Sequence, residues 1–171
     1  MKRTGILLAF IDTLICLLVY VFLAVNPSSL QQATSKPTAD YTIWCSWDTG
    51  LAVDIDQWLH LPDGTNIGYV RKDVGYATLE RDDLGVLTTN SQINIEIINL
   101  REPPDGEYGL SIHTYKAQQP SGNITVEITN AKGISVFSRT VPMPPNGRQQ
   151  GIVVFSIING QIEGARNTEL T

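Results

Sequence analysis

A single apolar stretch near the N-terminus constrains this chain more than any other feature of the sequence. Residues 4–25 read TGILLAFIDTLICLLVYVFLAV, with Asp12 as the only charged residue. At the helical rise of about 1.5 Å per residue, a stretch of this length crosses a hydrocarbon core of ~30 Å. We therefore expect residues 1–25 to form a short N-terminus and one transmembrane helix.

The basic residues around this stretch predict how it is oriented. Lys2 and Arg3 precede it, and no basic cluster follows directly after it. Signal peptides also begin with basic residues, but their apolar cores are shorter, roughly 7–15 residues, and end at a small-x-small cleavage site that is absent here. A cleaved signal is thus the alternative to the uncleaved anchor that we expect. The positive-inside rule places the N-terminus in the cytoplasm and the rest outside it, in the periplasm if the membrane is a bacterial inner membrane.

The sequence after the apolar stretch changes character twice. Residues 26–40, NPSSLQQATSKPTAD, are polar and contain almost no apolar side chains, so they predict a flexible stalk. Residues 41–171 contain short runs that alternate apolar and polar residues between turn signals, which is typical of half-buried strands. The expected strands lie in residues 41–47, 51–61, 66–70, 75–81, 92–100, 110–117, 124–130, 135–143 and 151–164.

These eight or nine short strands predict an all-β extracytoplasmic domain, an antiparallel β-sandwich of immunoglobulin or jelly-roll type. Turn signals separate the strands, among them the dipeptide Asn159-Gly160, which favours a tight hairpin. In residues 92–100 the isoleucines at 93, 95 and 97 alternate with Asn94 and Glu96. No amphipathic helix is expected outside the membrane stretch.

Composition and motifs argue against several function classes. The net charge of −5 does not suit a nucleic-acid-binding protein, which carries a basic face. No G-x-S-x-G, H-E-x-x-H or phosphate-loop motif is present, so we do not expect an enzyme or a bound cofactor. Cys16 lies in the membrane stretch and Cys45 outside it, so they are not expected to form a disulfide. We expect Cys45 to be a small buried hydrophobe.

Asp12 is the most informative residue of the membrane stretch. An ionised aspartate within the hydrocarbon costs about 2.5–3.5 kcal/mol on insertion scales, so such residues usually serve a function or are paired. Small residues repeat every four positions beside it, and Cys16 continues the Asp12 face one turn later, which favours close helix packing. Two interpretations stay open: a carboxylate that binds a proton or another ion, or a structural polar contact. The packing residues are Gly5, Ala9, Thr13 and Cys16.

The segment LLAFIDTLICLLVYVFLAVNP resembles the transmembrane helix of the ExbD/TolR/MotB class of ion-driven motor subunits. In that class an aspartate lies early in an apolar helix, a position that Asp12 matches here, and a proline often follows the helix, as Pro27 does. The resemblance implies a homodimer inside a pentameric ring of a multi-spanning partner of the ExbB/TolQ/MotA kind. It also implies proton or sodium flux through Asp12. The departure is the exterior domain, which in those families is not all-β.

The exterior domain resembles bacterial β-sandwich domains with a D-x-D-x-W…P-x-G…P-G-x-Y pattern, here beginning with DIDQWLHLPDG at residues 54–64. Four acidic residues of this region are candidates for a Ca²⁺ site, because hard cations prefer carboxylate oxygens. The alternative is that they are polar-face and turn residues. These acids are Asp54, Asp56, Asp82 and Asp83. Trp44, Trp47 and Trp58 are either core residues or a platform that stacks on glycans.

The sequence therefore predicts a B-type subunit of a two-component ion-driven motor whose periplasmic sandwich contacts an unidentified envelope ligand. The alternative is a membrane-anchored binding or adhesion module in which Asp12 is structural. A pilin-like subunit is a third hypothesis, but pilins carry an acid at the fifth position after the cleaved glycine, which is Phe10 here.

Overall fold

The computed structural model describes residues 12–18, 20, 38–48, 52–85, 94–117 and 120–168. The chain divides into two units, Met1–Pro37 and Thr38–Thr171. In the first unit, residues 12–18 and 20 are helical, and their side chains are exposed. No helix within the described residues is both long and apolar enough to cross a membrane. Most of the predicted membrane stretch and stalk, including Gly5 and Ala9, lies outside the described residues.

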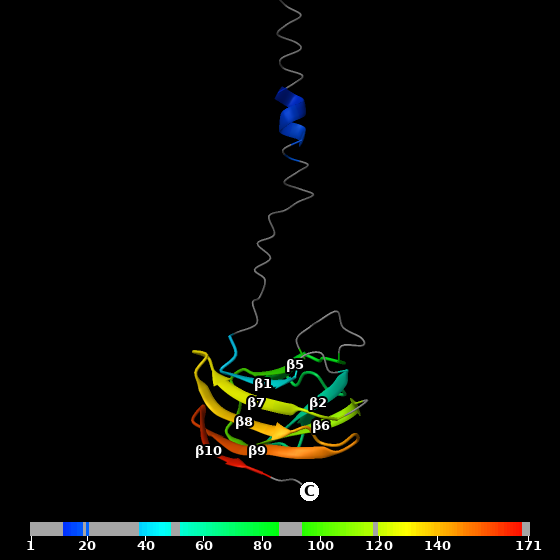
Figure 1. Cartoon of the computed structure of the whole chain (residues 1–171). Coiled ribbons are helices and arrows are strands. Elements are labelled where there is room, and N and C mark those ends of the chain that lie inside the picture. The colour runs from blue at the N-terminus through cyan, green and yellow to red at the C-terminus, as the bar shows by residue number, and fades with distance from the viewer. Residues whose placement is uncertain are drawn as a thin grey trace, which may run out of the picture. The chain divides into compact units, whose positions relative to one another are not determined.

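The second unit is a sandwich of two five-stranded antiparallel sheets, as the strand pattern predicted (Figure 1). One sheet has the order β4-β5-β1-β7-β8 and the other β10-β9-β6-β2-β3. The finer assignment to the immunoglobulin or jelly-roll type stays a prediction. The strands are β1 (Tyr41–Trp47), β2 (Val53–His60), β3 (Asn66–Ile67), β4 (Ala77–Arg81), β5 (Ile95–Leu100), β6 (Gly106–Ala117), β7 (Asn123–Asn130), β8 (Ser135–Pro142), β9 (Gln149–Ile158) and β10 (Gln161–Asn167).

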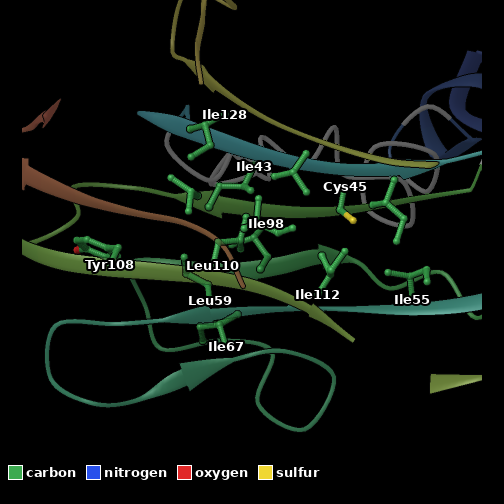
Figure 2. Packing of buried hydrophobic residues seen from close by; sticks show 14 of the residues in the cluster. Ile43, Cys45, Ile55, Leu59, Ile67, Ile98, Tyr108, Leu110, Ile112 and Ile128 are labelled. Atoms are coloured by element: carbon green, nitrogen blue, oxygen red, sulfur yellow. The ribbon is translucent and has the colours of Figure 1, made fainter. Parts of the chain in front are cut away.

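The core lies between the two sheets and is built from alternate residues of their strands. Figure 2 shows side chains such as Ile43 and Ile98 from one sheet packing near Leu59 and Leu110 from the other. Cys45 is fully buried in this core, as predicted. The turn at Asn159 and Gly160 has positive φ at both residues, which is the geometry that the Asn-Gly signal favours.

Strand β5 differs from the expected alternation. Its inward side chains include Glu96, Ile98 and Leu100, all at most 1% exposed, whereas Ile95 and Ile97 are only half-buried on the outer face. Both faces of this strand carry large apolar residues, so alternation alone does not fix which face is inside. The result is a carboxyl group within the sandwich, which matters for the site described next.

Candidate binding pocket

A cavity of about 340 Å³ opens on the outer side of the β2–β6 pair. Its lining comes from four parts of the chain: β2, the segment after β3, the loop after β4, and β6. Three of the four acids predicted to gather are among the lining residues. The full lining is Asp54, Asp56, Tyr69, Lys72, Asp82, Leu84 and Tyr115.

Pairing between β2 and β6 places the first two acids. Along β2 the inward positions are apolar except for Gln57, and Asp54 and Asp56 alternate with them onto the other face. Asp56 pairs in register with His113 of β6, and His113 Nδ1 lies 3.2 Å from Asp56 Oδ2. The other histidine of the chain, His60, lies at the end of the same strand as these acids. His60 contacts Asn66 and Ser111.

The loop after β4 separates the other two acids. Asp82 faces the cavity and accepts a hydrogen bond from Lys72 Nζ at 2.8 Å. Asp83 is 1% exposed and does not line the cavity. Its carboxylate accepts from Arg81 Nη2 at 2.8 Å and from the backbone N–H of Gly85 at 3.1 Å. Asp83 therefore shapes the loop that presents Asp82.

Aromatic rings form the wall of the cavity, and the sequence did not reveal them as a group. Trp58 packs over Gly68 so closely that a Cβ there would lie 2.7 Å from the indole. The Trp58 ring then meets Tyr69 edge-on, with ring centroids 5.3 Å apart. Tyr69 in turn lies 6.5 Å from Tyr115, centroid to centroid. Tyr69 and Tyr115 are 45% and 60% exposed, so their rings are accessible from solvent.

The tryptophans do not form one platform. Trp47 is buried in the core, which confirms the core interpretation for that residue. Trp44 lies in β1, in the other sheet from Trp58 in β2, and its indole N–H donates to Thr129. Of the three, Trp58 packs against Tyr69, which lines the cavity, but Trp58 is not itself a lining residue.

Glu96 of β5 lies behind the acidic side of the cavity. Its Oε2 accepts a hydrogen bond from the backbone N–H of Gln57 at 2.7 Å. Strand β3 pairs with β2 only at Leu59 and His60, so it does not reach this N–H. Glu96 thus connects the two sheets. Burial raises the pKa of its carboxyl well above the ordinary range. The Gln57 hydrogen bond opposes this rise in pKa, whereas the nearby Asp82 and Asp56 carboxylates add to it.

The cavity carries an excess of negative charge. Burial, and then the neighbouring carboxylates of Asp56, Asp82 and Asp83, raise the pKa of Asp54 from 3.8 to about 6. Burial also raises the pKa of Asp56, against the contact with His113. Asp54 Oδ1 is buried and meets no hydrogen-bond partner among the described residues. The site is therefore set up for a ligand that brings positive charge and hydrogen-bond donors.

All four residues of the predicted Ca²⁺ site lie within the described residues. Within the described parts of the chain, no group of three or more histidine, cysteine, aspartate or glutamate side chains has an arrangement that could hold a metal. The Ca²⁺ site at Asp54, Asp56, Asp82 and Asp83 stays a prediction. The Asp83 carboxylate already accepts hydrogen bonds from Arg81 and Gly85 of its own loop.

Comparisons with known proteins place the chain by fold. No family model matches the sequence, and no curated protein matches it. Its second unit belongs to the class of two-sheet antiparallel β-sandwiches. The solved structure described as "Crystal structure of unknown function protein SAV2460" is similar, with a TM-score of 0.51 and 10% sequence identity over 77% of this chain and 91% of that one. At this identity the likeness concerns the fold alone.

Proposed function

We propose that this chain is the single-pass B-type subunit of a two-component motor in the inner membrane. In this proposal Asp12 binds the translocated proton or sodium ion, and the periplasmic sandwich is the part that the motor moves. The observation that carries the proposal is one acid inside an apolar stretch long enough to cross a bilayer, in a segment that resembles the ExbD/TolR/MotB helices.

The geometry of residues 12–18 supports this proposal. They are helical, so Asp12 and Cys16 lie one turn apart on the same side, next to Thr13. The apolar side chains of this helical part are more than half exposed, so they offer a surface that lipid or another helix can cover. They are Leu14, Ile15, Leu17, Leu18 and Tyr20, at 51% to 71%.

The proposal requires partners. A single helix has no pore of its own, so a multi-spanning membrane protein, a ring of the ExbB/TolQ/MotA kind, supplies the ion path around Asp12. Two copies of this chain stand inside that ring. Each unit charge that crosses the membrane releases ~2.3 kcal/mol per 100 mV, which is the energy available for motion.

Replacing Asp12 with asparagine is the direct test of this proposal. We expect the D12N variant to be produced, inserted and bound to its multi-spanning partner at normal levels, but to lose its cellular function completely, because an amide cannot exchange a proton or neutralise a cation. The measurement is a growth or envelope phenotype of the deletion strain, complemented by each variant, together with co-purification in mild detergent.

The matched control is Asp12→Glu, which keeps the carboxyl group and should retain part of the function. Full function in the asparagine variant would reject an ion-binding role. Purification of the chain without a multi-spanning partner would also count against a motor.

The second candidate function is a membrane-anchored binding or adhesion module in which Asp12 only packs against another helix. The observation that favours it is the cavity of the sandwich, with its accessible tyrosines and with Asp54 Oδ1, which meets no hydrogen-bond partner among the described residues. It predicts that D12N keeps full function and that substitutions in the cavity remove it. The same pair of variants therefore distinguishes the two functions.

A further inference from the structure

We propose that the cavity between β2, β6 and the loop after β4 binds an organic cation: an ammonium or guanidinium group on an aliphatic stem, such as a lysine or arginine side chain. This inference rests on the second candidate function, the binding role of the sandwich, and it names the ligand class. It does not depend on Asp12.

Charge is the first argument for a cationic ligand. Three carboxylates, Asp54, Asp56 and Asp82, line the cavity together with one ammonium group, that of Lys72. Over the lining residues, three negative charges and one positive charge leave a net charge of −2. Because the three carboxylates line one cavity, their like charges repel one another. A bound cation would relieve that repulsion.

An unsatisfied oxygen is the second argument, and it is independent of the charge count. Asp54 Oδ1 is buried and meets no donor among the described residues. Buried oxygens in native proteins are normally hydrogen-bonded, so this oxygen of the cavity lacks a donor that a ligand can bring. An ammonium group brings three donors and a guanidinium five.

The aromatic and apolar residues that line the cavity favour an organic cation over a metal ion. The accessible Tyr69 and Tyr115 rings and the half-exposed Leu84 offer apolar surface for a stem, and aromatic faces attract cations within about 6 Å. A cavity of 340 Å³ is near the lower end of the range of small-molecule pockets, which begins at about 300 Å³. Lys72 already shows that an ammonium group can pair with a carboxylate of this cavity. Its Nζ lies 2.8 Å from Asp82, and its side chain is 55% exposed.

Calorimetric titration of the full chain in mild detergent tests the proposal. The probes are N-acetyl-lysine methylamide and N-acetyl-arginine methylamide for a peptide-borne cation, and cadaverine for a free amine. N-acetyl-norleucine methylamide, which has the stem without the charge, is the control ligand, and Ca²⁺ alone is a separate titration. We expect at least one cationic probe to bind, at least tenfold more tightly than norleucine, and more weakly as salt increases.

Two pocket variants and one control variant locate the binding. We expect Asp54→Asn and Tyr115→Leu each to weaken binding of the cationic probe at least fivefold. Tyr115 is exposed, so its leucine variant keeps the fold. Glu163→Gln removes one negative charge from exposed residues of β10 and should leave the affinity unchanged.

Three results would overturn the inference: equal binding of the norleucine probe, Ca²⁺ binding without binding of any amine, or unchanged affinity in both pocket variants. If the pocket variants still retain an envelope partner in pull-down from cells, the cation inference fails while the binding role of the sandwich stands. If wild type retains no envelope partner, the binding role itself fails.

Discussion

Replacement of Glu96 with glutamine is expected to raise the free energy of unfolding at pH 8 and to flatten its dependence on pH. Glutamine resembles the protonated acid: its carbonyl oxygen can still accept the Gln57 N–H, and its amide can donate toward Asp82. The variant therefore keeps the connection between the sheets without a buried charge.

The sign of the effect follows from proton binding. The folded pKa of Glu96 lies well above its unfolded value, so between these two values the folded state holds more protons than the unfolded one. The stabilising contribution is complete below the unfolded pKa and is lost as the pH rises through the folded pKa, by up to about 1.4 kcal/mol per pH unit for one proton. Asp54 changes stability in the same direction between pH 3.8 and about 6.

Urea unfolding of wild type and E96Q at several pH values from 4 to 9 measures this effect. Wild type should lose stability with increasing pH, and the variant should lose less. The exposed Glu163→Gln is the matched control and should follow wild type. Parallel curves for wild type and E96Q would mean that Glu96 ionises in the folded state as it does in the unfolded chain.

Phe155→Ala is expected to destabilise the sandwich by about 3–5 kcal/mol, the usual cost of truncating a buried phenylalanine. Phe155 of β9 is fully buried and stacks on Tyr108 of β6, with ring centroids 5.4 Å apart and planes 8° apart. Small domains are stable by only about 5–15 kcal/mol, so the variant would lose a large part of its stability.

The midpoint of urea unfolding checks this expectation, with the slope of the transition unchanged. Val136→Ala is the control, because this β8 residue is 40% exposed and surface substitutions usually change stability by less than about 0.5 kcal/mol. An unchanged midpoint in the Phe155 variant would mean that the stacked pair contributes little to the core.

Local signals made most strands predictable, whereas contacts between distant segments did not follow from them. Alternation marked β1 at its exact bounds, and Asn159-Gly160 marked the last hairpin. Alternation did not settle the inward face of β5, because Ile95 and Ile97 on one face compete with Ile98 and Leu100 on the other. Which face of β5 points inward depends on the rest of the core and on the hydrogen bond that the Gln57 N–H donates to Glu96.

The candidate site was predictable only in part for the same reason. The acids of β2 and of the loop after β4 stood out as short clusters, and three of the four do line one cavity. The histidine beside them did not, because Asp56 meets His113 through strand register across 57 residues of chain. The tyrosine wall likewise comes from segments with no shared pattern in the sequence.

The position of β1 determines how the domain withstands force. The chain enters the sandwich from its N-terminal side through this strand, which lies in the middle of its sheet with β5 on one side and β7 on the other. A pull along the axis of β1 would load both ladders of hydrogen bonds in shear, so many bonds would have to break together. An edge strand such as β8 would instead peel away bond by bond. Tension along the polypeptide thus reaches the sandwich through a strand that is held on both sides.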